Sequence, residues 1–294
     1  MDDDIAVTHH ASADSAAADS APAPDNVLPM PKMGPVAVVL PASGIGERSG
    51  REIPKQFVEV HDCPLVCHTI SAFHRIPYIE CIVVTVRREW KDFLLKRITR
   101  YGFHKVMVVE GDERSRHYSI RNGVATLTDP ELIHMEFEVV VVHDAVRPFV
   151  CESVLCEVIA KAQHGGAAGV VVPCASTIVL INDDNLLEET LVRSKCRNSE
   201  MPQAFRLKQF HSAYQQASDD TMLHGTECLQ IYRHGNPEDR IALVTAAPGL
   251  HWKVTYAGDF DRVSALLSNR TINNSSSKGS SSNSSSSSDG TTLV

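Results

Sequence analysis

One segment carries most of the structural information in this chain: Val36-Ala37-Val38-Val39-Leu40-Pro41-Ala42-Ser43-Gly44-Ile45-Gly46-Glu47-Arg48. Its apolar half predicts a short buried strand, and its small residues and glycines predict a loop directly after that strand. Backbone N–H groups of such a loop can point at one anion, and glycine lets a phosphate come close. Arg48 and Lys55 add two positive charges, which suits a triphosphate better than a single carboxylate.

Other interpretations of this loop are possible. A dinucleotide-binding fingerprint would need glycine at position 49, but Ser49 stands there and the next glycine is Gly50. A Walker A loop is excluded because the sequence contains no Gly-Lys-Ser or Gly-Lys-Thr. A turn in which Gly44 and Gly46 only shape the chain stays open, and nucleoside triphosphate binding is the favoured function.

Four short blocks follow one another along residues 36 to about 262. They are the loop above with Pro54-Lys55-Gln56, then His143-Asp144-Ala145-Val146-Arg147-Pro148, Met201-Pro202-Gln203-Ala204-Phe205 and Trp252-Lys253-Val254-Thr255. In this order they resemble the sugar- and polyol-phosphate nucleotidyltransferases, in particular the 4-diphosphocytidyl-2-C-methyl-D-erythritol synthase (cytidylyltransferase) family. The resemblance covers the catalytic domain only, whereas longer animal relatives carry a second, C-terminal domain.

Further details resemble the animal branch of that family, the D-ribitol-5-phosphate cytidylyltransferases. They lie in residues 199–205, in Gly225-Thr226-Glu227-Cys228-Leu229-Gln230 and in residues 252–256. The branch implies transfer of a cytidylyl group from CTP to D-ribitol 5-phosphate, giving CDP-ribitol, a donor for protein O-mannosyl glycan synthesis, and pyrophosphate. 2-C-methyl-D-erythritol 4-phosphate is the alternative acceptor.

The composition predicts one domain between two disordered tails. Of the 294 residues 43% are hydrophobic, which is enough for an ordinary globular core. Residues 1–34 are rich in Ala, Asp and Pro, residues 270–294 are rich in Ser and Asn, and neither tail offers enough apolar surface to fold. Residues 35–269 would then form the cytidylyltransferase domain.

The sequence also predicts a cytosolic protein. The N-terminus lacks the basic start and apolar stretch of a secretory signal, and no run of apolar residues is long enough for a membrane span. A formal net charge of −8 argues against a nucleic-acid-binding surface. We therefore expect neither a membrane nor a nucleic acid as a partner.

Strands and helices are expected to alternate along the domain. Near-continuous apolar strands such as residues 139–142 favour a parallel sheet buried on both faces, and the alternation predicts a three-layer α/β fold. The expected strands are 36–41, 81–86, 105–109, 138–143, 168–173, 177–181, 241–246 and 253–256, and the expected helices are 65–75, 90–101, 119–127, 151–164 and 206–217. Ligands of such sheets bind at the carboxyl ends of strands, where Gly44 and Asp144 both fall.

Residues 176–197 interrupt this alternation and read as a hairpin with a polar turn. The spacing alone favours a surface hairpin within one monomer. The family resemblance instead implies a Rossmann-like nucleotidyltransferase fold, mostly parallel, with a protruding β-arm that crosses to a second subunit. Thr177 and Arg193 of that arm would then help to build the partner's sugar-phosphate pocket in a homodimer.

The resemblance also implies roles for single residues. Arg48 would contact the outer phosphates, Lys55 and Lys253 would flank the α-phosphate, and Asp144 is the candidate ligand of Mg²⁺. The residues implied for CTP are Pro41, Ala42, Ser43, Gly44, Gly46, Gly111, Ser119 and Asp144, and those implied for the acceptor are Asp144, Arg147, Thr177, Arg193 and Thr226.

The expected chemistry needs no general base. The second pKa of a phosphate monoester is about 6, so the acceptor is mostly a dianion at neutral pH and can attack the α-phosphorus of CTP directly. Cations and Mg²⁺ are then needed to bring the two anions together. Two other classes stay open: an NAD(P)-dependent oxidoreductase and a noncatalytic nucleotide-binding module.

Overall fold

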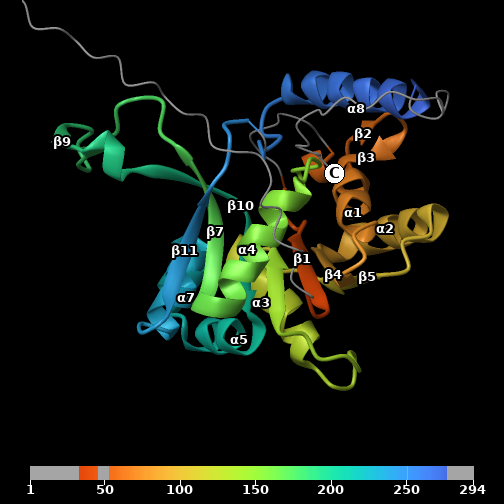
Figure 1. Cartoon of the computed structure of the whole chain (residues 1–294), viewed down its shortest axis with the longest axis horizontal. Helices are drawn as coiled ribbons and strands as arrows, with labels where there is room; N and C mark the ends of the chain where they lie inside the picture. The colour runs from red at the N-terminus through yellow and green to blue at the C-terminus, as the bar shows by residue number, and fades with distance from the viewer. Residues whose placement is uncertain (1–32, 46–52, 250, 277–294) are drawn as a thin grey trace, which may run out of the picture. The chain divides into compact units, whose positions relative to one another are not determined.

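A seven-stranded sheet forms the centre of the computed structural model of this chain (Figure 1). The structure describes residues 33–45, 53–249 and 251–276, with side chains as far as residue 268. The strands lie in the order β11-β7-β10-β6-β1-β4-β5. Their bounds are β1 Val36–Pro41, β4 Ile79–Val86, β5 Val106–Glu110, β6 Val139–Val142, β7 Gly166–Pro173, β10 Arg197–Arg206 and β11 Arg240–Thr245.

Helices cover both faces of this sheet, which confirms the expected three-layer α/β fold. One face packs against α1 (Leu65–His74), α2 (Arg88–Tyr101) and α4 (Glu152–Gly165). The other face packs against α3 (Arg116–Thr128), α5 (Leu207–Gln216), α6 (Asp219–His224) and α7 (Cys228–Gly235). The helices predicted from apolar spacing are present, with ends within a few residues of those expected.

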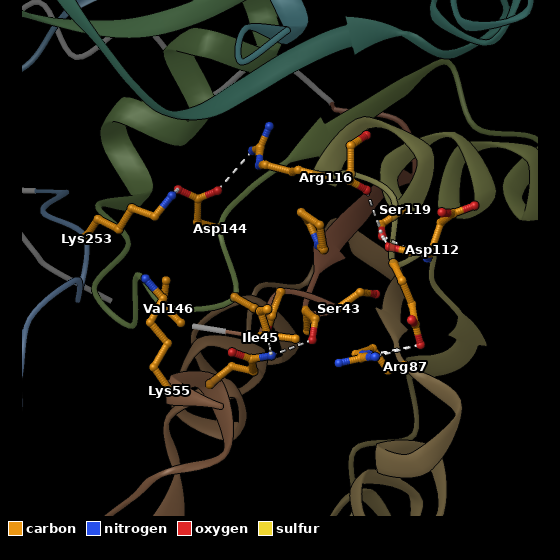
Figure 2. Close-up of a pocket in the computed structure, with 17 residues that line it drawn as sticks. Ser43, Ile45, Lys55, Arg87, Asp112, Arg116, Ser119, Asp144, Val146 and Lys253 are labelled. Carbon is orange, nitrogen blue, oxygen red and sulfur yellow. Dashed lines mark hydrogen bonds and ion pairs between the residues drawn. The ribbon is translucent and has the colours of Figure 1, made fainter. Parts of the chain in front are cut away.

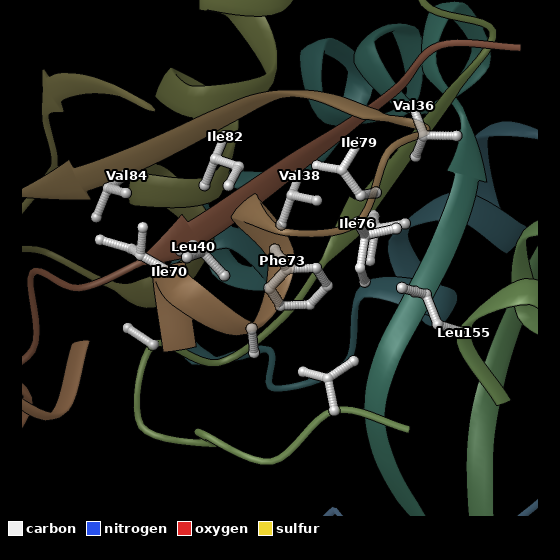
Figure 3. Close-up of a cluster of buried hydrophobic side chains, with 14 of the residues drawn as sticks. Val36, Val38, Leu40, Ile70, Phe73, Ile76, Ile79, Ile82, Val84 and Leu155 are labelled. Atoms are coloured by element: carbon white, nitrogen blue, oxygen red, sulfur yellow. The ribbon is translucent and has the colours of Figure 1, made fainter. Parts of the chain in front are cut away.

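Strand β1 divides the core in two because its side chains alternate between the faces. Val36, Val38 and Leu40 point into the cluster beneath α1, together with Phe73 of that helix (Figure 3). Ala37 and Val39 point into the opposite cluster. Burial on both faces explains why this strand is apolar at nearly every position.

Strand β10 was not predicted, and it is the one antiparallel strand of the sheet among the described residues. It lies between β6 and β7 and pairs antiparallel with both. Its first residues are polar and exposed, and its pairing with β7 shifts register between Glu200 and Gln203, around Pro202. A polar start and an internal proline conceal the strand from an analysis of apolar patterns.

The strand expected at residues 253–256 is not formed. The backbone there bonds to other groups: Val254 N–H donates to the carbonyl of Val146, and the N–H groups of Thr255 and Tyr256 donate to Oδ2 of Asp259. The segment crosses the end of the sheet as an irregular stretch. Because these bonds take the place of hydrogen bonds to a neighbouring strand, the apolar residues of this segment are packed without the segment joining the sheet.

The expected arm is a two-stranded hairpin of β8 (Val179–Ile181) and β9 (Leu187–Thr190), followed by the short helix η3 (Arg193–Lys195). Figure 1 shows it extending away from the sheet. Its residues in both strands are exposed, including Val179, Leu180 and Leu187. The arm therefore presents apolar side chains that its own chain leaves uncovered.

The domain ends differently from the expectation. Helix α8 runs from Asp259 to Ser276 and continues past residue 269, so residues 270–276 of the expected disordered tail are helical. It packs near a small hairpin, β2 (Glu59–Val60) and β3 (Cys63–Pro64). Residues 1–32 and 277–294 lie outside the described residues. Within the described part of the chain, none of the helices has the length and apolar character that a bilayer crossing requires.

Candidate active site

A cleft of about 600 Å³ opens at the carboxyl ends of β1, β4, β5 and β6. In the sheet, β1 lies between β4, which follows β1 in the large sheet, and β6, which comes later in the chain. The cleft therefore lies where the strand order reverses. It is lined by Pro41, Ala42, Ser43, Gly44, Ile45, Lys55, Gln56, Arg87, Asp112, Glu113, Ser115, Arg116, Ser119, Asp144, Ala145, Val146 and Lys253. Eight of the predicted site residues are among them.

The loop after β1 is held by a residue to which the sequence analysis assigned no role. The buried side-chain amide of Gln56 donates to the carbonyl of Ala42 at 2.7 Å and to that of Gly44 at 2.8 Å. Gln56 lies in the short helix η2 (Lys55–Phe57). The Pro-Lys-Gln motif thus fixes the loop and positions Lys55 beside it. Gly46 and Arg48 lie outside the described residues, and their roles stay predictions.

Gly111, directly after β5, leaves room for the hydroxyl groups of Ser43 and Ser119. A Cβ atom at position 111 would stand 1.8 Å from Oγ of Ser43 and 3.2 Å from Oγ of Ser119. Ser119 also fixes the following backbone, because its Oγ accepts from the N–H of Asp112 and donates to the Asp112 carbonyl, both at 3.0 Å. A larger residue at this position would therefore displace the side chain of Ser43.

Asp144 lies at the centre of a cluster of three cations. Its Oδ1 accepts from Nη2 of Arg116 at 2.9 Å, and its Oδ2 is 2.9 Å from Nε of Arg147 and 3.1 Å from Nζ of Lys253. The residue follows β6 directly and is buried. Figure 2 shows it between Lys253 and Arg116, with Lys55 on the same side of the cleft as Lys253 and with Ser119 on the opposite side.

The cluster sets the ionisation of Asp144. Burial by itself would raise the pKa of Asp144, but the charges of Arg116, Lys253 and Arg147 outweigh it and hold that pKa well below its usual range. Asp144 is therefore a carboxylate at neutral pH, and the three cations exceed it by two positive charges. Such an excess suits a phosphate-bearing ligand.

Nearby histidines do not contribute to this positive charge. Burial lowers the pKa of His143 to about 3 and the pKa values of His117 and His251 to about 4. All three rings are neutral at neutral pH. The cationic character of the site therefore comes from arginine and lysine side chains.

Lys55 and Lys253 come from opposite ends of the domain and meet at one place. Nζ of Lys55 donates to the carbonyl of Val254, next to Lys253, at 3.0 Å. Both lysines line the cleft, and the role at the α-phosphate that the family resemblance implies for them stays a prediction. The bond fixes the irregular stretch that carries Lys253 against the short helix η2, which begins with Lys55.

Arg116 was not among the predicted site residues, although it stands with Ser119 in an Arg-x-x-Ser pattern that resembles the base-recognition loop of the family. Besides Asp144, it contacts the thiol of Cys228 through Nη1 at 3.4 Å. Cys228 begins α7, whose start is capped by Glu227, and Glu227 also accepts from Nε2 of Gln203 at 2.8 Å. The third sequence block and the Gly-Thr-Glu-Cys segment thus support the arginine that holds Asp144.

The remaining predicted residues lie elsewhere. Arg147 is buried beside Asp144, which it holds, and it is not among the residues that line the described cleft. Thr226 is exposed before α7, and Thr177 and Arg193 are exposed on the arm, where Nη1 of Arg193 donates to the carbonyl of Ala175. These last three do not line the described cleft of their own chain. Their roles toward a substrate stay predictions.

The chain is similar to known cytidylyltransferases. The family model for 2-C-methyl-D-erythritol 4-phosphate cytidylyltransferase (IspD) matches residues 36–269. The chain is 42% identical over 242 residues to the D-ribitol-5-phosphate cytidylyltransferase of Mus musculus, a match that covers 81% of this chain and 53% of the relative. It is 36% identical over 181 residues to the ribitol-5-phosphate cytidylyltransferase of Lacticaseibacillus paracasei, covering 62% of this chain and 76% of the relative.

A solved structure shows the same fold. The crystal structure of 4-diphosphocytidyl-2C-methyl-D-erythritol synthase from Anaerococcus prevotii matches with a TM-score of 0.67 at 22% sequence identity, and the match covers 81% of this chain and 98% of that one. The chain spans about half the length of the animal relatives that it matches.

The packing around Gly111 gives a direct test of the cleft. We expect Gly111→Ala to displace Ser43, to lower the melting temperature and to weaken nucleotide binding, because the added Cβ would overlap with Oγ of Ser43. A second substitution, Ser43→Gly, removes the overlapping atoms and should restore part of the lost stability. Thermal unfolding of the single and double variants, with and without CTP, measures both effects. Equal stability of Gly111→Ala and the unaltered protein would contradict the described packing.

Proposed function

This chain belongs to the 2-C-methyl-D-erythritol 4-phosphate cytidylyltransferase family, and we propose that its cleft transfers a cytidylyl group from CTP to a polyol phosphate. D-ribitol 5-phosphate is the proposed acceptor, since relatives named for it match at 36–42% identity. The products would be CDP-ribitol and pyrophosphate. The observation that carries the proposal is the gathering of Lys55, Lys253 and the Asp144 cluster beside the loop after β1.

The reaction proposed is a displacement at the α-phosphorus. An oxygen of the acceptor's phosphate forms a new P–O bond, and the bond from the α-phosphorus to the bridging oxygen of the β-phosphate breaks, so that pyrophosphate leaves. Because the acceptor is already a dianion, no residue needs to remove a proton. The chain's own contribution is to position both anions and to stabilise the extra charge at phosphorus.

Each part of the cleft has a proposed role in this displacement. The loop of Pro41, Ala42, Ser43 and Gly44 would hold the triphosphate, and Ser119 with the backbone beside Gly111 would face the cytosine. Lys55 and Lys253 would flank the α-phosphate. Asp144 and Arg147 would meet the acceptor.

Mg²⁺ belongs to the same proposal. Within residues 33–45, 53–249 and 251–268 there is no group of three or more His, Cys, Asp or Glu side chains that could enclose a metal ion. Mg²⁺ commonly binds through one or two carboxylates together with substrate phosphates. Asp144 fits that role, because a carboxylate offers about four acceptor positions and Arg116, Arg147 and Lys253 use three. When bound, the ion would neutralise charge on the phosphates of CTP.

A homodimer with shared sites is also proposed. The arm exposes Ile181, Leu187 and Val192 at 55–67% of their surface, which is unusual for apolar side chains that gather on one hairpin. A second subunit would cover them and would bring Thr177 and Arg193 to the acceptor side of its partner's cleft. The cytosol stays the predicted location of the reaction.

The activity is tested by pyrophosphate release. We expect the highest kcat/KM with CTP and D-ribitol 5-phosphate, lower values with ribulose 5-phosphate and 2-C-methyl-D-erythritol 4-phosphate, and loss of activity in EDTA. UTP, ATP and GTP should be poor donors, because a mismatched base leaves the site's polar groups unpaired. Comparable kcat/KM for UTP would refute the cytosine assignment.

Two outcomes would favour another class of function. No pyrophosphate release with any acceptor would favour the noncatalytic module. Thermal stabilisation by NADPH instead of CTP would favour the oxidoreductase.

Lys253 provides a test of the catalytic cluster. Lys253→Ala should lower kcat on the order of 10²–10³-fold, the usual loss for one preorganised charge contact, while the protein stays folded. Lys161→Ala is the matched control, because Lys161 forms an ion pair with Glu157 on the surface of α4. Steady-state kinetics and thermal unfolding of both variants give the comparison. Turnover close to that of the unaltered protein in folded Lys253→Ala would remove this lysine from the site.

The shared site is tested by subunit mixing. Arg193→Ala should weaken binding of the acceptor with little effect on CTP binding, and Arg193→Ala and Lys55→Ala should each be nearly inactive alone. If Arg193 completes the partner's cleft, heterodimers of the two variants hold one intact site, and random pairing should restore about a quarter of the native activity. Activity assays on refolded or co-expressed mixtures, with the heterodimer confirmed by native mass spectrometry, measure this. Confirmed heterodimers without any rescue would show that each chain completes its own site.

A further inference from the structure

Glu200 is an acidic residue beside the cluster for which the proposed reaction has no role. It lies in β10, shortly after the arm, and its carboxylate pairs with Nη1 of Arg147. The same guanidinium donates from Nε to Oδ2 of Asp144 at 2.9 Å and from Nη1 to the carbonyl of His251. One buried arginine thus serves two carboxylates at once.

The two carboxylates are not held equally. The side chain of Asp144 is 7% exposed and is fixed by Arg116 and Lys253 as well as by Arg147. The side chain of Glu200 is 24% exposed, and its backbone lies where the pairing of β10 with β7 is about to shift register. Rotation of Glu200 into water leaves the other contacts of Arg147 intact. Of the two partners, Glu200 is the one that can be exchanged.

The charges show when such an exchange is favourable. Arg116, Arg147 and Lys253 exceed Asp144 by two positive charges, and Glu200 reduces that excess to one. A phosphate monoester is mostly a dianion at neutral pH. Counted over these five side chains alone, a dianion beside Glu200 leaves a net charge of minus one in a poorly solvated place, whereas a dianion without Glu200 brings the cluster to neutrality.

We infer that Glu200 is a resident counter-anion that occupies Arg147 while the acceptor site is empty and is displaced by the acceptor's phosphate. This inference rests on the proposed function, in which Arg147 meets that phosphate. The exchange keeps the arginine oriented before the acceptor arrives. The contact between Glu200 and Arg147 also weakens the binding of any anion at this position, because the anion must displace the carboxylate. A dianion therefore displaces Glu200 more readily than a monoanion does.

The test compares Glu200→Gln with the unaltered protein at saturating CTP. The amide has the shape of the carboxylate without its charge, so KM for D-ribitol 5-phosphate should fall about two- to fivefold, the range expected for one partly exposed ion pair. The inhibition constant of inorganic phosphate should fall with it, while KM for CTP changes by less than about twofold. Glu157→Gln on α4, which removes an equal surface charge away from the cleft, should change none of these values.

The outcomes separate this inference from the proposed function. A residue with only a structural role would raise KM for the acceptor when altered, so an unchanged or higher KM in folded Glu200→Gln would overturn the exchange. If Glu200→Gln does not fold, Glu200→Asp replaces it, because the shorter side chain reaches Arg147 less well. Glu200→Asp should lower KM for the acceptor by a smaller factor than Glu200→Gln. An unchanged or higher KM in folded Glu200→Asp would also overturn the exchange. If the unaltered protein transfers no cytidylyl group, the proposed function fails, and calorimetric titration of inorganic phosphate into both proteins still decides whether Glu200 competes for Arg147.

Discussion

A single buried carboxylate imposes the main constraint on this structure. Asp144 is ionised and almost removed from water, and an uncompensated charge in that position would destabilise the folded state strongly. Its three cations come from the start of α3, from the loop after β6 and from the segment before α8. The carboxylate therefore couples segments that are far apart in the sequence, and the cleft forms where they converge.

The sheet makes this convergence possible. Strands β1 and β6 are buried on both faces, so packing holds the positions of their carboxyl ends, from which Ala42 and His143 follow directly. Gln56 and Gly111 then shape the loop after β1 from two sides, one by hydrogen bonds and the other by the absence of a side chain. A charge cluster placed on such a frame needs little reorganisation when an anionic substrate arrives, which is the condition for electrostatic catalysis.

The parts of the site that directly follow regular strands could be predicted from the sequence. The apolar runs of β1 and β6 located the loop at Gly44 and the carboxylate of Asp144, since both follow a strand directly. The sequence was not sufficient for β10, whose polar start and Pro202 hide its pairing, or for the irregular stretch around Lys253. The ion pair between Arg116 and Asp144 joins residues on different elements, and nothing in the local pattern of either residue indicates the other.

The hydrogen bond from Lys55 to Val254 closes a loop of 199 residues. During synthesis on the ribosome, the loop after β1 and most of the sheet emerge long before the segment that carries Lys253. A nascent chain that has not yet exposed Val254 lacks the carbonyl that accepts from Lys55, and its Asp144 lacks one of three cations. A chain terminated before Lys253 would therefore contain every strand of the sheet and still hold a buried carboxylate with only two of its counter-charges.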